Sequence, residues 1–212
     1  MISDYPKPYP VQFRPQTWAL FILRLLGWKV MFEGFPAQQG IAIAYPHTSN
    51  WDFFYAMLAK CAAGMPVHFW GKASLFQIPL FGRLVHFLGG VPLDRSSARG
   101  SVGQVVELIN AHKKNNSFFW FGLSPEGTRK FQNGWRSGFY HLTLQTDVPL
   151  LLIRMDYGKK EFRIDQFIHL SGDEIKDYER INQAYANVIG FHPNQACPIQ
   201  PIKKNLQQGD GK

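Results

Sequence analysis

The feature that most constrains the fold of this 212-residue chain is an alternation of short apolar runs with longer helical patterns. Runs of strand length occur at 41–45, 67–70, 117–123, 149–155 and 161–168. This alternation predicts a single α/β domain, in which helices flank a largely parallel central sheet. The length fits one domain with a full core. Because open parallel sheets bind ligands at the carboxyl ends of their strands, the residues that follow each run are the informative ones.

Helical spacing is found in five segments, at 51–63, 75–88, 101–114, 138–146 and 174–189. Before them, a strongly apolar helix is expected over 16–32, with Arg24 and Lys29 as its charged residues. No stretch of the sequence reaches the roughly 18–20 consecutive apolar residues that span a bilayer. We therefore expect this apolar helix to associate with a membrane surface without crossing it.

The formal net charge of +8, from 23 Lys and Arg against 15 Asp and Glu, favours acidic partners: nucleic acid, an anionic membrane or a phosphorylated substrate. No zinc finger or ribonucleoprotein-type motif is present, so nucleic acid is not an expected partner. The two cysteines, Cys61 and Cys197, have no metal-site spacing, which predicts no metal centre and suggests a reducing compartment. Residues 1–10 contain three prolines and no basic-then-apolar run, so a secretory signal is not expected.

The first candidate catalytic residues are His47 and Asp52, in a loop between a predicted strand and a predicted helix. They can meet if the histidine lies in the turn and the aspartate in the first helical turn, with Ser49 or Asn50 as the cap. The carboxylate then holds one imidazole nitrogen and leaves the other free to act as a general base. The other interpretation of this spacing is a capped helix start with an incidental histidine.

Two further loops offer cations near strand ends. Gly89 and Gly90 end a helical pattern, and the short apolar strand that follows ends in Asp-Arg at Arg95. A guanidinium in that place could grip a phosphate through two parallel hydrogen bonds, whereas the alternative is an ordinary surface turn. Lys72 likewise follows the strand 67–70.

The loop after the run 117–123 has the sequence Ser-Pro-Glu-Gly-Thr-Arg-Lys. Gly127 lets the backbone approach a ligand closely. Around it, Glu126, Thr128 and Arg129 offer an acceptor, a hydroxyl and a guanidinium, which suits a ligand with both hydroxyls and a phosphate. The alternative is a polar loop with a turn glycine.

Taken in order, these residues resemble the glycerolipid acyltransferase family typified by bacterial 1-acyl-glycerol-3-phosphate acyltransferase. The resemblance covers roughly residues 40–155 and includes the four family blocks: His47–Asp52 (H-x4-D), Gly89–Arg95, Pro125–Arg129 (P-E-G-T-R) and Val148–Pro149. The chain departs from the family pattern at Pro46, where Asn is frequent, and at Leu152, where a second proline is frequent. These departures leave the acceptor open.

The resemblance implies an acyltransferase that moves a fatty acyl group from acyl-CoA or acyl-carrier protein to the hydroxyl of a lysophospholipid, chiefly 1-acyl-glycerol-3-phosphate. His47 would remove the hydroxyl proton and Asp52 would orient the imidazole. The acceptor would be bound by Lys72, Arg95, Glu126, Gly127, Thr128 and Arg129. The resemblance implies no metal and no cofactor beyond the thioester co-substrate.

On this basis we expect three parts: an apolar membrane-associating segment at 1–36, an acyltransferase domain at 37–201 and a polar tail at 202–212. The protein would work at the cytoplasmic face of a membrane as a peripheral or monotopic enzyme. One alternative is a different acceptor, such as a lyso-ornithine lipid. Another is a non-catalytic lipid-binding protein at the membrane surface, although the intact pair of His47 and Asp52 argues against it.

Overall fold

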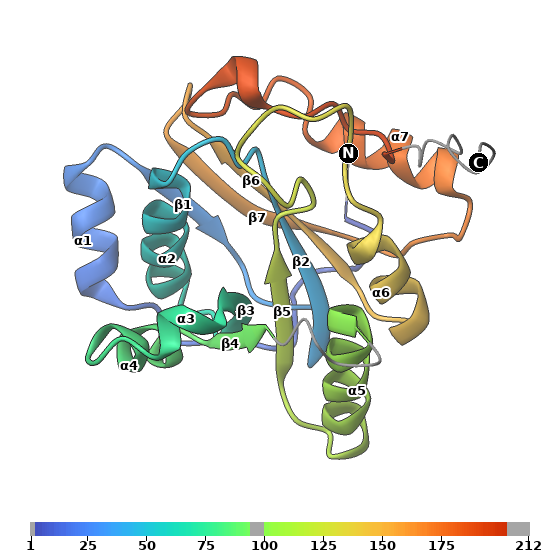
Figure 1. The fold of residues 1–212 in the computed structure, drawn as a ribbon, viewed down its shortest axis with the longest axis horizontal. Coiled ribbons are helices and arrows are strands. Elements are labelled where there is room, and N and C mark those ends of the chain that lie inside the picture. The colour runs from blue at the N-terminus through green and yellow to red at the C-terminus, as the bar shows by residue number, and fades with distance from the viewer. Residues whose placement is uncertain (1–2, 94–99, 203–212) are drawn as a thin grey trace, which may run out of the picture.

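The computed structural model describes residues 3–93 and 100–202, without the side chains of residues 72, 75, 93 and 101. A seven-stranded sheet runs through the middle of the molecule in the order β1-β7-β6-β2-β5-β3-β4 (Figure 1). Its strands are β1 (Lys29–Phe32), β2 (Gln39–Tyr45), β3 (Val67–Lys72), β4 (Gly90–Leu93), β5 (Phe119–Leu123), β6 (Leu150–Asp156) and β7 (Glu161–Ile168).

Five of these strands, β6, β2, β5, β3 and β4, run in the same direction. β7 pairs antiparallel with β6, and β1 pairs parallel with β7 at the sheet edge. The predicted single α/β domain with a largely parallel sheet is therefore confirmed. The carboxyl ends of these five parallel strands lie on the same side of the sheet, and His47 and Glu126 follow two of them.

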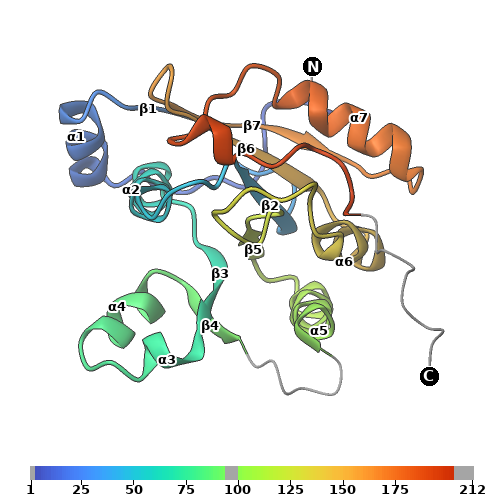
Figure 2. The ribbon, with the colours of Figure 1, turned by 45° about the horizontal axis from the view of Figure 1, so that its top comes forward.

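The helices cover both faces of the sheet. They are α1 (Thr17–Leu25), α2 (Trp51–Ala63), α3 (Ala73–Phe76), α4 (Phe81–Phe87), α5 (Gly100–Lys114), α6 (Gly138–Thr146) and α7 (Glu174–Ala184), followed by the 3₁₀ turn η1 (Pro193–Gln195). Figure 2 shows α1 and α2 on one side of the sheet and α5, α6 and α7 on the other.

The side-chain alternation of the strands builds a core on each face. In β2, Ile41 and Ile43 pack in the cluster under α5, α6 and α7, whereas Ala42 belongs to the cluster under α1 and α2. β5 alternates in the same way, and its Trp120 is fully buried on the α1–α2 side. A Cβ at Gly40 would lie 2.3 Å from the Trp120 ring, so this strand position requires glycine. The sheet is thus buried on both faces, as its apolar runs predict.

The expected helix over 16–32 is wrong beyond Leu25. Gly27 adopts a left-handed conformation, with φ of +79°, and the Trp28 amide donates to the Leu23 carbonyl, which ends α1. The chain then forms the edge strand β1 instead of more helix. Since Tyr9 is buried against Phe167 of β7, the first 36 residues are joined to the domain along much of their length.

Two other helices differ from prediction in extent. The pattern over 75–88 is split into α3 and α4 around Pro79 and Leu80, and Leu80 has a φ of +62°. α7 ends at Ala184 instead of at 189, and the following residues cross irregularly toward the carboxyl edge of the sheet. Within residues 3–93 and 100–202, no helix has both the length and the apolar content needed to cross a bilayer.

Candidate active site

The candidate site forms where three neighbouring parallel strands end. β6, β2 and β5 lie side by side, with Tyr45 opposite Arg154 and Ile43 opposite Leu123. The loop after β2 carries His47, the loop after β5 carries Glu126, and Tyr157 directly follows β6. Residues that are far apart in sequence are therefore brought to one place by the sheet.

His47 and Asp52 face each other across the start of α2. Nδ1 of His47 lies 3.3 Å from Oδ2 of Asp52, and the exposed fractions of the two side chains are 25% and 1%. Within the described part of the chain, no hydrogen bond or ion pair engages Nε2 of His47, and a side chain that is 25% exposed can present this nitrogen to a ligand. The prediction that the pair meets through a turn and a first helical turn agrees with this geometry.

The Asp52 carboxylate is held by four donors. Its Oδ2 accepts from the backbone amides of Thr48 and Ser49, at 2.6 and 2.8 Å, in addition to facing His47. Its Oδ1 accepts from the hydroxyl of Tyr157 at 2.7 Å. Burial by itself raises the pKa of Asp52, but the hydrogen bonds from His47, Tyr157 and the two amides outweigh it, so the pKa lies below its usual value. The aspartate is therefore charged where it meets the imidazole.

Tyr157 was not singled out in the sequence. The one sequence feature that could indicate a role for Tyr157 is its place directly after a parallel strand. Its hydrogen bond to Asp52 spans 105 residues of sequence, so no local pattern predicts it. Burial and the bond to Asp52 both raise the pKa of Tyr157 well above its usual value. The hydroxyl thus stays protonated and remains a donor.

Glu126 is fully buried behind the His47 loop. Its Oε2 accepts from the His47 amide at 2.5 Å, and its Oε1 accepts from the Cys197 amide at 3.0 Å. Burial raises the pKa of Glu126, and the two amide donors offset this only in part. In this arrangement Glu126 braces the loop that carries His47, and the direct acceptor contact expected from the sequence stays a prediction.

The rest of the P-E-G-T-R loop lies nearer the surface. Gly127 and Arg129 are exposed and Thr128 is half-buried. Gly127 has a φ of +64°, and a Cβ there would lie 2.9 Å from Cδ of Arg136, whose side chain covers this turn. Arg129 and Arg136 have no ion-pair partner among the residues that the structure describes. As far as residues 3–93 and 100–202 show, two guanidinium groups at this loop are not engaged in an ion pair.

The remaining predicted cations are placed only in part. Lys72 is the last residue of β3, beside β4 in the sheet. β4 ends at Leu93, so Arg95 lies outside the described residues. The backbone of Lys72 thus lies at a strand end, and its contact with the acceptor stays a prediction.

A segment late in the chain, residues 189–197, packs over the loop that carries His47. The His192 amide donates to Oγ1 of Thr48 at 3.1 Å. With its amide nitrogen turned toward them, Gln195 donates to the carbonyls of Thr48 and Arg129, at 3.1 and 2.8 Å. A Cβ at Gly190 would lie 3.1 Å from Thr48, so the two segments are in close contact. The sequence of this segment has neither strand nor helix spacing, and no pattern pointed to its place.

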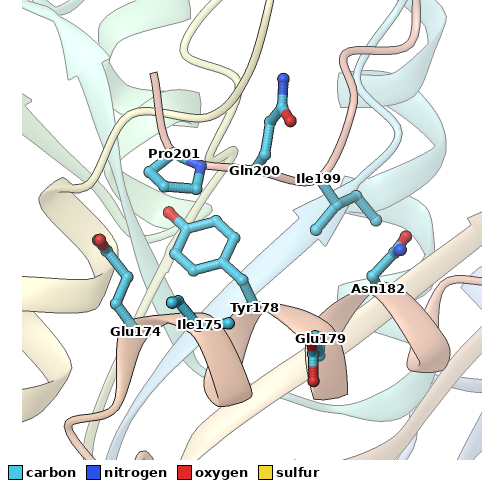
Figure 3. Close-up of a pocket in the computed structure, with 8 residues that line it drawn as sticks. All are labelled: Glu174, Ile175, Tyr178, Glu179, Asn182, Ile199, Gln200 and Pro201. Atoms are coloured by element: carbon cyan, nitrogen blue, oxygen red, sulfur yellow. The ribbon is translucent and has the colours of Figure 1, made fainter. Parts of the chain in front are cut away.

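A surface cavity of about 230 Å³ lies elsewhere, between α7 and residues 199–201. Figure 3 shows its lining, in which the Tyr178 ring from α7 stands beneath Pro201. None of its lining residues belongs to the loops that carry His47, Asp52 or Glu126. The chemistry at the strand ends is therefore separate from this cavity.

Comparison with known proteins gives consistent results. The model of a family described as Acyltransferase matches residues 29–156. The chain is 29% identical over 112 residues to a chloroplastic 1-acyl-sn-glycerol-3-phosphate acyltransferase of Brassica napus, covering 51% of this chain and 32% of the relative. It is also 29% identical over 136 residues to the 1-acyl-sn-glycerol-3-phosphate acyltransferase of Cocos nucifera, covering 61% of this chain and 42% of that relative. The matched part thus spans well under half the length of these relatives.

Among solved structures, the crystal structure of the 1-acyl-sn-glycerophosphate acyltransferase PlsC from Thermotoga maritima is similar, with a TM-score of 0.51. The match covers 80% of this chain and 74% of that one, at 19% identity. At this identity the likeness concerns the fold.

Proposed function

This chain belongs to the acyltransferase family, and on that premise we propose that it transfers a fatty acyl group from acyl-CoA or acyl-carrier protein to the hydroxyl of 1-acyl-glycerol-3-phosphate. The observation that supports the proposal is the placement of His47 Nδ1 against the buried, charged Asp52, while Nε2 makes no hydrogen bond to the residues that the structure describes. The names of the matched relatives support this choice of acceptor.

In the proposed reaction, Nε2 of His47 takes the proton of the acceptor hydroxyl. The oxygen attacks the carbonyl carbon of the thioester, so that a C–O bond forms and the C–S bond breaks. The thiolate leaves and receives the proton from the imidazole, and no acyl-enzyme forms. Asp52 keeps the imidazole in the required tautomer and stabilises its charged form. Because thiolate is a good leaving group, base catalysis and positioning carry most of the acceleration.

We propose that the loops around His47 and Asp52 bind the acceptor headgroup. Arg129, Gly127 and Thr128 would bind it from the loop after β5, with Lys72 from β3 and Arg95 beyond β4. A guanidinium matches a phosphate with two parallel hydrogen bonds. Glu126 would act behind them, through its bond to the His47 amide. Since Arg129 lacks an ion-pair partner in the described part of the chain, it can meet the phosphate without breaking one.

We also propose that the enzyme works at an anionic membrane surface on the cytoplasmic side. One face of α1 exposes Trp18, Phe21 and Leu25, the last of them 71% exposed, while Ala19 and Leu23 pack inward. α4 exposes Leu84 and Phe87, the latter 82% exposed. Both helices lie toward the same side as α2, which begins at the catalytic loop (Figures 1 and 2).

The charge distribution supports this orientation. Between residues 5 and 93, the acidic side chains are those of Glu33 and the buried Asp52, against a larger number of Lys and Arg residues. Exposed aromatic rings and cations together suit the headgroup boundary of anionic lipid. The face that carries α1 and α4 is therefore the one we expect to meet lipid.

A substrate panel tests the proposed reaction. Labelled acyl-CoA and acyl-carrier protein are each offered with 1-acyl-glycerol-3-phosphate, glycerol-3-phosphate, lysophosphatidylcholine and a lyso-ornithine lipid. We expect fastest transfer to 1-acyl-glycerol-3-phosphate. His47→Ala should lower kcat by about a hundredfold or more, as loss of a positioned base does. The matched control is His141→Ala, an exposed histidine of α6. Unchanged turnover in folded His47→Ala protein would remove the base from the mechanism, and preference for another lipid would change the acceptor.

A further inference from the structure

We infer that Tyr157 is a positioning residue of the catalytic pair, which fixes the Asp52 carboxylate and, through it, the His47 imidazole. The inference deepens the proposed function and rests on the assignment of His47 as the base. The four family blocks do not include Tyr157, which lies just beyond the segment 29–156 that matches the family model.

The two oxygens of Asp52 have different partners. Oδ2 faces His47 and accepts the two loop amides, which fix that end of the carboxylate. Oδ1 accepts from the hydroxyl of Tyr157 at 2.7 Å, and the structure gives it no second donor among the residues it describes. Because the side chain is 1% exposed, water cannot readily replace this donor. The hydroxyl therefore sets the rotation of the carboxylate plane about its last bond.

Tyr157 is itself held on three sides by aromatic rings. Trp28 meets it edge-on with centroids 4.9 Å apart, Phe191 does so at 5.2 Å, and Tyr55 at 5.9 Å. The Tyr157 amide also donates to the Ile189 carbonyl at 2.8 Å. These contacts support the orientation of the phenol in which its oxygen meets Asp52.

Most of this support comes from outside the segment that matches the family model. Trp28 precedes residue 29, and Tyr157 and Phe191 follow residue 156. Residues on both sides of the matched segment thus pack together around the Tyr157 ring, which bonds to Asp52. Without the hydroxyl, a buried carboxylate oxygen loses its donor and the carboxylate can turn away from the imidazole.

The test compares Tyr157→Phe with Tyr55→Phe. Both changes remove one phenol oxygen from the same aromatic cluster, but Tyr55 makes no hydrogen bond to Asp52. We expect Tyr157→Phe to lower kcat by about tenfold, less than the hundredfold that a 1 Å misplacement can cost, with little change in either KM. Tyr55→Phe should keep wild-type kcat. Phe191→Ala, at an exposed ring, should give a smaller loss of the same kind.

A second readout does not depend on turnover. Because the bond from Tyr157 helps to lower the pKa of Asp52, the ¹³C carboxyl resonance of Asp52 should titrate at higher pH in Tyr157→Phe than in the wild type, and Tyr55→Phe should leave it unchanged. A residue that only supports folding would lower Tm without moving this titration.

The inference is overturned if Tyr157→Phe leaves both kcat and the Asp52 titration unchanged, or if Tyr55→Phe produces the same changes. A failure of the proposed base would look different. In that case His47→Ala would keep its turnover, while the carboxyl resonance would still report the bond between Tyr157 and Asp52.

Discussion

Glu126 Oε2 accepts a hydrogen bond from the backbone amide of His47 at 2.5 Å, across 79 residues of sequence. This bond ties the loop after β5 to the loop after β2, and the other oxygen ties both to Cys197. A residue of the P-E-G-T-R block therefore helps to position His47, the proposed base. The bond joins two blocks that are distant in sequence.

Glu126→Gln should weaken this arrangement, because its NH2 group replaces one of the two carboxylate oxygens and cannot accept from the backbone N–H that it faces. Leaving one buried amide unpaired costs about 1–3 kcal/mol. We expect a lower Tm by thermal circular dichroism and a lower kcat, with the acceptor KM less affected. Gln132→Glu, in the same loop region but half-buried, serves as a control for the exchange of these side chains. If the acceptor KM rises while kcat stays constant, Glu126 contacts the acceptor directly and does not act through the His47 loop.

Arg129→Ala should raise the KM of the acceptor far more than that of the thioester donor. The loss of a charge-assisted contact to phosphate costs about 1.5–3 kcal/mol, or roughly tenfold to a hundredfold in KM. Arg95→Ala is expected to behave in the same way. Lys159→Ala, an exposed cation on the turn between β6 and β7, is the matched control. The measurement is steady-state kinetics with each substrate varied in turn, and equal effects on both substrates would contradict the assignment.

The pH dependence of stability should report on Asp52. Its pKa is lower in the folded protein than the usual value of about 3.9 in the unfolded chain. The stabilisation that follows is fully present above the unfolded pKa and is lost as pH falls through the folded pKa. The Tm of the wild type should therefore fall more steeply than that of Asp52→Asn as pH is lowered from 5 to 3. Parallel Tm curves for the two proteins would show that Asp52 does not titrate in this way.

Much of the fold could be predicted, because local patterns agree with the tertiary structure. α2 begins and ends where its pattern does, and Gly64 closes it in a left-handed conformation. β1 could not be predicted in this way, since its residues continue the apolar spacing of α1. It becomes a strand only because Gly27 ends the helix and the edge of β7 offers partners.

The site shows the same division. His47 lies in the loop before α2 and Asp52 in the first turn of that helix, so their spacing allows them to meet, although it fits an incidental histidine as well. Tyr157 and Glu126 reach the same loop through strand order, which the sequence does not contain as a local pattern. The buried position of Glu126 could not be predicted either, because it depends on residues near Cys197 folding back over the loop.

The membrane face gives the last prediction. Removing residues 1–33 would also remove β1 and the buried Tyr9, so substitutions on the exposed face of α1 are the cleaner test. The variant Trp18→Ser/Phe21→Ser/Leu25→Ser leaves the inward-facing Ala19 and Leu23 in place. It should sediment less with vesicles that contain anionic lipid, while turnover of a short-chain, water-soluble acceptor stays near that of the wild type.

The control for that variant is Ile175→Ser, which alters an equally exposed apolar residue on α7, away from α1 and α4 (Figure 1). Binding of the wild type should weaken with added salt, because part of the attraction is between cations and anionic headgroups. Two results would contradict the assignment. One is a wild-type protein that does not sediment with anionic vesicles at low salt. The other is an equal loss of binding in Ile175→Ser, which would show that exposed apolar area in general, and not the α1 face, governs the interaction.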